Sequence, residues 1–295
     1  MIAFGSAITE PEAYRRYAEP GIRAAAEPDS EVYAFAAVGT VARSYNLLLD
    51  AAAARGDLEA LVIVHPYAEI ADPRLCGKLR AALGDPSVAV VGCVGATGVR
   101  SLAWWEGAVS SAPLVHRYVE HGGGDLPGFA WARPERPLGE VDAVAGFLLA
   151  LSPWAVRTLR FDESMRLNYG FDVDYCLRAR EGGRKVVTAD LRAIYHHALQ
   201  LIGDLDMWVE AHIRFAEKWD RQRLDDEGWK RRARRAEAER EAARAIGYSN
   251  MLIADARVAR LERALADATG SASWRVTAPL RRLNARARRI RARRG

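Results

Sequence analysis

Two polar residues follow a short apolar run at a place where ligand binding is common. The run LVIV ends at His65, and the turn HPYAEIADP that follows carries Glu69. In open α/β sheets, ligands bind outside the carboxyl ends of the strands. Because Mg²⁺ and Mn²⁺ prefer oxygen ligands with phosphates completing the shell, His65 and Glu69 stand where a phosphate-bound metal would be held. The structural alternative is a strand-end histidine with a backbone partner and a solvated glutamate at a helix start.

A second group of charged residues lies in NYGFDVDYCLRAREGG, where we expect a helix to begin at Asp172. Helical spacing places Asp174 and Arg178 four residues apart on one face. The helix dipole keeps a carboxylate in the first turn ionised, which suits a general base that takes a proton from an acceptor hydroxyl. The structural alternative is an ordinary helix with amino-terminal acids and one ion pair.

Aromatic rings and histidines give weaker candidates. Trp104 and Trp105 follow GVRSLA, and they would either stack on a sugar or a base or be buried in the core. His196 and His197 follow an Ile-Tyr pair and would offer a ring nitrogen to a diphosphate or a metal, although most such histidines are structural.

Short apolar runs separated by helical patterns predict the strands that position these residues. Their alternation with helices indicates an α/β fold, and the runs are residues 1–4, 32–37, 61–65, 88–94, 145–151 and 185–189. The stretch SYNLLLDAAAARGD predicts a helix that Ser44 caps and that ends before Gly56. Residues 107–137 are rich in Gly, Pro and aromatics without a sustained period, which predicts a long loop or a small insertion.

In this order, the segments resemble the inverting-type, family-2-like glycosyltransferase-like proteins of the GT-A fold, and within them the streptomycin-biosynthesis type. The resemblance covers residues 1–220, and the matching stretches are IAFGSAITEPEAY, SYNLLLDAA, LVIVHPYAEI, VAVVGCVGATG with WWEG, VDAVAGFLLALSPWAVRTLRFDE, GFDVDYCLRAREGGRKV, AIYHH and FAEKWD. It implies an α/β, GT-A mixed sheet flanked by helices, to which this chain adds a carboxyl-terminal α-helical extension.

The resemblance also implies a reaction and a set of site residues. A nucleotide-diphosphate sugar would be the donor, a glycan, glycolipid or metabolite the acceptor, and the transfer a direct, inverting displacement. Asp172 matches the catalytic base, and Asp174 matches a second acid of the catalytic group. Ser6 lies in the first strand-loop, which borders the nucleotide, and Arg178 supports the base. Beyond what the resemblance implies, we expect Arg100 on the donor side, and Trp104 and Trp105 with Arg178 on the acceptor side.

One position departs from the family pattern. Relatives carry His-x-Asp, whereas this chain has His65-Pro66-Tyr67, and tyrosine is a poor magnesium ligand. Glu69 and His197 would then replace the missing ligand for Mn²⁺ or Mg²⁺, or the donor would bind without metal. The leaving diphosphate must be neutralised in either case, by His65, His197 or Arg100. The alternative from another class is a non-catalytic module that binds a nucleotide sugar or glycan and scaffolds partners.

The charge of the chain is concentrated at its carboxyl end. The formal net charge is +5, and residues 274–295 contain nine arginines and no acid, so that subtracting nine leaves −4 on residues 1–273. The body therefore shows no basic footprint for nucleic acid. The stretch SASWRVTAPLR resembles the end of helical extensions on bacterial cell-surface glycan enzymes, which indicates cell-envelope polysaccharide or glycolipid assembly. Anionic lipids would attract such a segment, and the alternative is a solvated basic tail.

Three parts of the chain follow from these observations: a glycosyltransferase-like domain at 1–220, a helical or coiled-coil extension at 221–270, and a basic amphipathic tail at 271–295. In the extension, apolar residues recur at helical spacing, which indicates a coiled coil and a homo-oligomer; they are Leu252, Val258, Leu261 and Leu265. Gly270 predicts a break, and Pro279 can start a last arginine-rich helix.

The cysteines and the amino-terminal stretch indicate the cellular compartment of the protein. Cys76, Cys93 and Cys176 are widely spaced without metal-type pairing, so we expect reduced, structural thiols. The start lacks a basic and then apolar leader, and no run of 18 apolar residues occurs in the sequence. We therefore expect a cytoplasmic protein, either free or peripheral at the inner face of the membrane.

Overall fold

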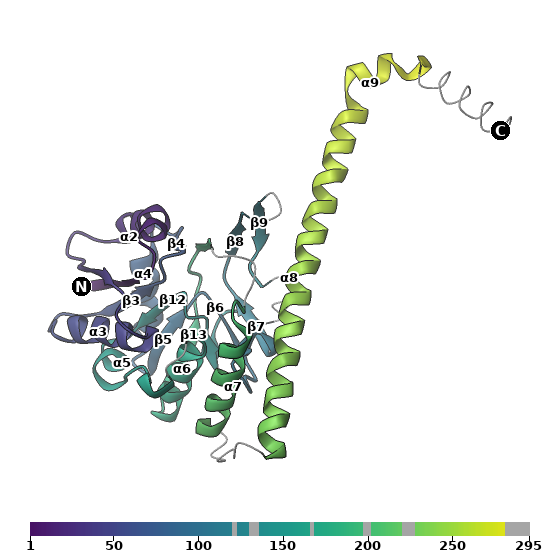
Figure 1. Cartoon of the computed structure of the whole chain (residues 1–295). Helices are drawn as coiled ribbons and strands as arrows, with labels where there is room; N and C mark the ends of the chain where they lie inside the picture. Colours follow the sequence, from purple (N-terminus) through teal and green to yellow (C-terminus); the bar gives the residue numbers. More distant parts are fainter. Residues whose placement is uncertain (120–122, 130–135, 166–167, 197–201, 220–227, 281–295) are drawn as a thin grey trace. The chain divides into compact units, whose positions relative to one another are not determined.

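The computed structural model describes residues 1–119, 123–129, 136–165, 168–196, 202–219 and 228–280 (Figure 1). The chain divides into two compact units, residues 1–249 and residues 250–295. The predicted boundary between residues 220 and 221 lies outside the described residues.

The first unit contains a mixed sheet with strand order β10-β13-β5-β12-β3-β1-β2 in the described part of the chain. Strand β1 is parallel to β2 and β3, β13 is parallel to β5, and β12 runs antiparallel between β3 and β5. All six predicted strands are confirmed, as β1 (Ile2–Ile8), β2 (Val32–Ala36), β3 (Ala60–Val64), β5 (Val88–Gly92), β12 (Leu148–Leu151) and β13 (Lys185–Thr188), and β10 (Glu140–Val141) extends one edge.

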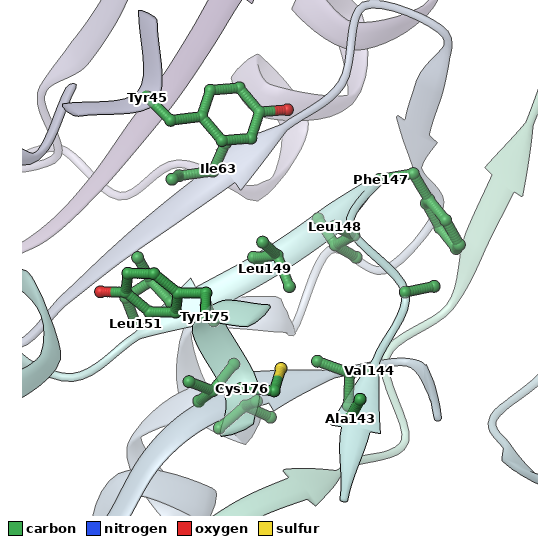
Figure 2. Packing of buried hydrophobic residues seen from close by; sticks show 14 of the residues in the cluster. Tyr45, Ile63, Ala143, Val144, Phe147, Leu148, Leu149, Leu151, Tyr175 and Cys176 are labelled. Atoms are coloured by element: carbon green, nitrogen blue, oxygen red, sulfur yellow. The ribbon is translucent and has the colours of Figure 1, made fainter. Parts of the chain in front are cut away.

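The core lies along the middle of this sheet, where β3, β5 and β12 are buried over their whole lengths. Continuous burial explains why these strands read as unbroken apolar runs, since helices cover the sheet. Figure 2 shows part of this cluster, in which Tyr45 comes from α3 (Val41–Ala53), and Tyr175 and Cys176 come from α6 (Phe171–Glu181). The three cysteines are free and buried, as predicted.

Helix α3 begins one turn earlier than predicted. Its cap is Thr40, whose side chain accepts a hydrogen bond from the Arg43 N–H at 3.2 Å. The prediction that Ser44 caps this helix is therefore wrong. The Ser44 hydroxyl instead accepts from the Val38 N–H at 2.9 Å, so it fastens the loop after β2 to the first turn of the helix.

Residues 107–137 hold short strands rather than a plain loop. The described part contains β7 (Ala108–Ser111), β8 (Leu114–Tyr118) and β9 (Gly124–Pro127). Two small sheets use them, with orders β11-β6-β7 and β4-β14-β8-β9. Their other strands are β4 (Ala68–Ile70), β6 (Val94–Thr97), β11 (Ala143–Val144) and β14 (Ala193–Tyr195). The segment is therefore a small insertion whose strands pair with each other and with strands from elsewhere in the chain.

The remaining helical elements of the first unit surround these sheets. They are α1 (Pro11–Ala13), the π-helical turn η1 (Tyr14–Ala18), α2 (Glu19–Ala25), α4 (Leu75–Leu83), the short turn η2 (Trp104–Glu106), α5 (Pro153–Thr158), the short turn η5 (Glu163–Met165) and α7 (Leu205–Trp219). Helix α8 (Trp229–Gly270) starts in this unit, where the indole N–H of Trp208 on α7 donates to the Ala238 carbonyl at 3.0 Å.

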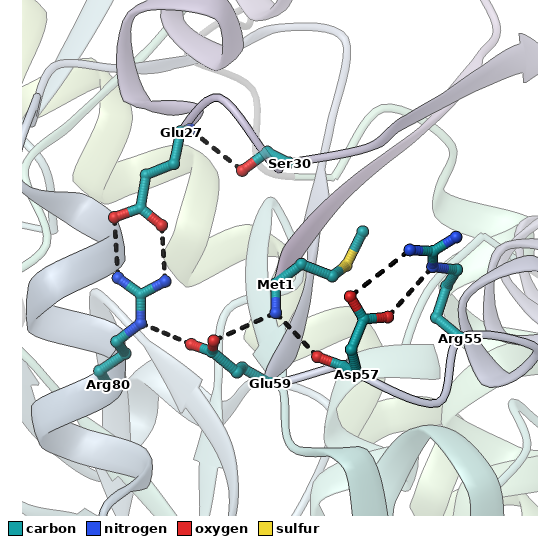
Figure 3. Close-up of polar contacts among 7 residues, drawn as sticks. All are labelled: Met1, Glu27, Ser30, Arg55, Asp57, Glu59 and Arg80. Carbon is teal, nitrogen blue, oxygen red and sulfur yellow. Dashed lines mark hydrogen bonds and ion pairs between the residues drawn. The ribbon is translucent and has the colours of Figure 1, made fainter.

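Polar contacts join the elements at the amino-terminal edge of the sheet (Figure 3). The Met1 amine donates to the Asp57 carbonyl at 2.7 Å and to Glu59 at 3.1 Å. Arg80 of α4 bridges Glu59 and Glu27. Partly exposed ion pairs of this kind contribute little each, and this edge lies opposite the carboxyl ends of β1 and β3.

The second unit holds the rest of α8 and the short helix α9 (Ala272–Val276). The predicted break is confirmed, because α8 ends at Gly270 and the Ser271 side chain caps α9 by accepting from the Trp274 N–H at 3.2 Å. The arginine-rich residues 281–295 lie outside the described residues. With a mixed sheet, flanking helices and a helical extension, the predicted fold class is confirmed. No helix among the described residues is both long enough and apolar enough to cross a membrane.

Candidate active site

Asp172 lies in the first turn of α6 with its carboxylate held by two backbone groups. Oδ2 accepts from the Gly146 N–H at 2.8 Å, and Oδ1 accepts from the Val173 N–H at 2.9 Å. The helix starts after Gly170, whose φ of +81° lies in the left-handed region that glycine adopts without strain. The carboxylate therefore has a fixed orientation at the helix start.

Gly146 is needed for this close approach. A Cβ at that position would lie 2.7 Å from the Phe171 ring and 2.9 Å from the Asp172 Cβ. Since real Cβ atoms do not come so close to other heavy atoms, any side chain here would push α6 away from the strand.

Asp172 and His65 belong to the same edge of the sheet. The His65 N–H donates to the Phe147 carbonyl at 2.9 Å, and Phe147 directly follows Gly146, which binds Asp172. The segment 146–147 leads into β12, which runs antiparallel to β3. The two residues predicted from separate motifs are thus joined through one dipeptide at the carboxyl end of β3.

Aromatic rings surround this dipeptide. Tyr195, at the end of β14, stacks on Phe147 with ring centroids 4.8 Å apart and meets His65 edge-on at 5.9 Å. Burial raises the pKa of Tyr195 and of Tyr45, and the Asp172 carboxylate adds to both shifts. Asp172 therefore lies close to these rings, and its side chain is partly buried.

The same surroundings change the basicity of Asp172. Burial raises the pKa of its carboxyl group above the ordinary value, and the backbone hydrogen bonds from Gly146 and Val173 oppose that change. Desolvation disfavours the charged form, so the ionised carboxylate is a stronger base than an exposed one. A base of this kind matches proton removal from a sugar hydroxyl better than an ordinary surface aspartate does.

Tyr67 and Glu69 make contacts with other elements. The Tyr67 hydroxyl donates to Glu10 at 2.6 Å, and this bond raises the pKa of Tyr67 to about 12. Glu69 on β4 lies 2.6 Å from the ring nitrogen Nε2 of His196, and the Tyr17 ring stacks on His196 at 4.0 Å. Tyr17 belongs to the π-helical turn η1, and such turns are frequent at functional sites.

The described residues do not fit the expected metal ligand set. Among them no group of three His, Cys, Asp or Glu residues could hold a metal ion. The Glu69 oxygen Oε2 pairs with His196, the His65 nitrogen Nδ1 accepts from the Tyr67 N–H at 3.3 Å, and His197 lies outside the described residues. Glu69 and His65 thus direct these atoms to protein partners rather than to a shared metal position.

Asp174 and Arg178 lie on α6, as Asp172 does, but their side chains contact different parts of the chain. Asp174 is buried, and its Oδ1 accepts from the Trp219 indole N–H at 3.0 Å and from the Lys218 ammonium at 2.6 Å. Arg178 donates to the Arg160 carbonyl and lines an open hollow of about 590 Å³. Asp174 therefore fastens α6 to α7, while Arg178 fastens α6 to the loop before η5.

Ser6 and Arg100 occupy different surroundings. Ser6 is fully buried on β1 beside Ala34, and its hydroxyl has no hydrogen-bond partner among the described residues. Arg100 is exposed in the loop after β6, where the Gly98 N–H donates to Asp142 at 2.6 Å. No hydrogen bond or ion pair in the described part of the chain joins either residue to Asp172, and their donor-side roles stay predictions.

Trp104 and Trp105 are buried in η2. Trp105 stacks on Trp208 of α7 at 5.7 Å, and Trp104 lies 4.8 Å from the Phe129 ring. Both positions agree with the structural alternative of core tryptophans, and an acceptor-side role stays a prediction.

Several residues of this edge do not stand out in the sequence. They are Glu10, Tyr17, Gly146, Phe147 and Tyr195. The local signals are a Gly-Phe pair before a buried apolar run and the tyrosine in front of the paired histidines. Gly146 and Phe147 reach this edge through the pairing of β12 with β3 across more than 80 residues, and Glu10 and Tyr17 through side-chain contacts with Tyr67 and His196, which no local pattern reveals.

Comparisons with known proteins complete this description. No family model matches the chain. The streptomycin biosynthesis protein StrF from Streptomyces griseus is 28% identical over 204 residues, covering 67% of this chain and 66% of that protein's length. Among solved structures, the GDP-mannose and Mn²⁺ complex of the mannosyltransferase PcManGT from Pyrobaculum calidifontis has a TM-score of 0.44 and 14% identity, covering 93% of this chain and 81% of the other.

A structure of GalNAc-T7 with UDP, GalNAc and Mn²⁺ has a TM-score of 0.45 at 10% identity, covering 81% of this chain and 54% of the other. Structural likenesses with such low scores support no conclusion about this chain, whereas the sequence similarity to StrF extends over most of both proteins. The predicted resemblance to the streptomycin-biosynthesis type of glycosyltransferase-like proteins is confirmed by the similarity to StrF.

Proposed function

We propose that this chain is a glycosyltransferase that moves a sugar from a nucleotide-diphosphate donor to an acceptor hydroxyl, with Asp172 as the general base. The observation that carries the proposal is the position of the Asp172 carboxylate, which is fixed by Gly146 at the same sheet edge as His65. The carboxyl ends of strands are where open α/β sheets bind ligands.

The proposed reaction is a direct displacement with inversion at the anomeric carbon. The acceptor oxygen forms the new bond to that carbon while the bond from the carbon to the diphosphate oxygen breaks. The hydroxyl proton passes to Asp172, and the nucleoside diphosphate leaves with the electron pair. General-base help of this kind is worth about 10²–10⁴-fold in rate.

We assign the neutralisation of the leaving diphosphate to His65, His197 or Arg100. Ser6 and Glu69 complete the proposed donor side. Asp174 is assigned as a positioning residue, because its contacts with Lys218 and Trp219 set the orientation of the helix that carries Asp172.

Replacing Asp172 by asparagine tests the proposal most directly. Asp172→Asn keeps the shape of the side chain and removes the base, so transfer should fall by about 10²–10⁴-fold while donor binding is retained. Asp50→Asn on α3 is the matched control, because Asp50 is an exposed acid on another helix. A fully active Asp172→Asn enzyme would remove Asp172 from the mechanism.

A non-catalytic binding and scaffold module is the second candidate. It is favoured by Tyr67, which binds Glu10 at the position where the resemblance implies an acidic metal ligand, and by the lack of a three-ligand group in the described chain. Donor hydrolysis should be measured with and without Mn²⁺, alongside donor binding by thermal shift. Binding without turnover under every metal condition would support the scaffold, whereas turnover supports the enzyme and also shows its metal dependence.

The proposed function also includes an acceptor and a cellular compartment. We assign a glycan, a lipid-linked acceptor or a metabolite as the acceptor, and the cytoplasm as the compartment. The basic tail after Gly270 would bring the chain to the inner face of the membrane, because Trp274 and Val276 are exposed among arginines. Binding to anionic vesicles that is lost on deletion of residues 271–295 would support the membrane contact.

A further inference from the structure

The second unit exposes a regular apolar stripe on α8. Met251, Val258, Leu261 and Leu265 are 49%, 53%, 63% and 63% exposed. The exposed small residues Ala254 and Ala268 complete the series, so that the stripe follows alternating steps of three and four residues. Exposing large apolar side chains to water is unfavourable, so such a stripe favours a partner that covers it. The alternating spacing of three and four residues is that of the contact face, or seam, of a coiled coil.

This stripe is separate from the face that the first part of α8 buries. The buried face is formed by Ala238, Ala242, Ala245 and Ser249. Continuing the same steps of three and four residues from Ser249 leads to Leu252, not to Met251. The stripe on residues 251–268 therefore needs its own partner.

The charges beside the stripe favour a particular partner. With Met251, Val258 and Leu265 at the first apolar position of each heptad, Arg257 falls at position g and Glu262 at position e. In a parallel pair of identical helices, residue g faces residue e of the next heptad in the other helix, so Arg257 faces Glu262. An antiparallel pair over the whole stripe would instead set Asp255 against Glu262, two acids, and Arg257 against Ala264, so that Arg257 would have no acid to pair with.

We propose that the stripe binds a second copy of this chain as a parallel, in-register, two-stranded coiled coil. Val258 and Leu261 face their counterparts across the seam, and Arg257 of each copy pairs with Glu262 of the other. A β-branched residue at the first apolar position, with leucine at the second, favours two strands. Because the seam is short and contains two alanines, the dimer forms and dissociates with protein concentration.

The oligomeric state of the full chain, measured by sedimentation over a wide concentration range, tests this surface. We expect a monomer–dimer equilibrium that the double change Leu261→Asp and Leu265→Asp converts to monomer. Glu262→Arg should weaken the dimer about tenfold or more, and adding Arg257→Glu should restore it. Arg263→Glu is the control, since position 263 lies opposite the seam and its change should leave the dimer intact.

A disulfide tests the orientation. Under oxidation, Leu261→Cys should give a covalent dimer, because residue 261 faces itself only in the parallel, in-register arrangement, while Arg263→Cys should not. The native cysteines are buried and do not compete. A chain that stays monomeric at every concentration overturns the proposal. A dimer without the Leu261→Cys crosslink also overturns it, as does a monomer whose stripe instead binds anionic vesicles.

Discussion

The backbone N–H of Gly146 donates to the carboxylate of Asp172 at 2.8 Å, across 26 residues of chain. This single bond connects the start of α6 with the segment that enters β12, and the next residue, Phe147, receives the hydrogen bond of His65. The proposed base is thus held between the first turn of α6 and the turn that enters β12. A fixed position of this kind is what catalysis requires.

Gly146→Ala should reduce transfer strongly and destabilise the fold by about 1–3 kcal/mol, because the added methyl would overlap the Phe171 ring and the Asp172 Cβ. Steady-state kinetics and urea unfolding measure the two effects. Gly77→Ala is the control, because a Cβ there meets nothing within 4 Å among the described residues, and alanine stabilises the interior of helix α4. A Gly146→Ala enzyme with unchanged kcat would show that the fixed position of Asp172 is unimportant.

The pH dependence of transfer should report the raised pKa of Asp172. A general base must be ionised, so kcat/KM should rise with pH through a pKa above the ordinary value for aspartate. The effect on stability has the opposite sign. A raised folded-state pKa contributes stability below the unfolded-state pKa, and that contribution is lost as pH rises through the folded-state value. A kcat/KM that is flat down to the ordinary pKa of aspartate would contradict this expectation.

Glu241 of α8 should give the first unit a second pH dependence. Burial raises its pKa to about 7, and Glu237 and Glu106 add to the shift, while Ser101 donates to its Oε1 at 2.9 Å. Arg240 opposes the shift, and His212 of α7 lies 3.6 Å from the Glu241 Oε2. The stability contributed by the protonated form is present at pH 4 and is lost as pH rises through about 7.

Glu241→Gln should therefore stabilise the protein by about 1–3 kcal/mol at pH 8 and change little at pH 5. Denaturant unfolding at the two pH values measures this difference. Glu239→Gln is the control, because Glu239 is an exposed acid on the same helix. Equal effects of Glu241→Gln at both pH values would contradict a protonated Glu241 in the folded state.

Asp174→Asn separates a positioning role from a catalytic one. The change removes the charge that binds Lys218, so we expect the free energy of unfolding to fall by about 1–3 kcal/mol. The loss is limited because Lys218 is partly exposed and keeps its ion pair with Asp162. Transfer by the folded variant should keep a kcat within about tenfold of the parent and an unchanged pH profile. A loss as large as that of Asp172→Asn, without loss of stability, would instead make Asp174 a catalytic group.

The sequence predicted the central sheet because its strands are continuous apolar runs, such as LVIV before His65 and VAVV before Gly92. It did not reveal the small sheets, whose strands have two to five residues and come from widely separated parts of the chain. It placed His65 at a strand end and Asp172 at a helix start. Gly146 and Phe147, which connect the two, depend on the antiparallel insertion of β12 between β3 and β5.

Single-turnover transfer by Asp172→Asn, measured together with donor affinity, tests the central claim most directly. We expect that the chemical step slows by about 10²–10⁴-fold, that the donor dissociation constant changes less than about threefold, and that Asp50→Asn behaves like the parent. An Asp172→Asn chain that transfers sugar at the parental rate would contradict the role of Asp172 as the base.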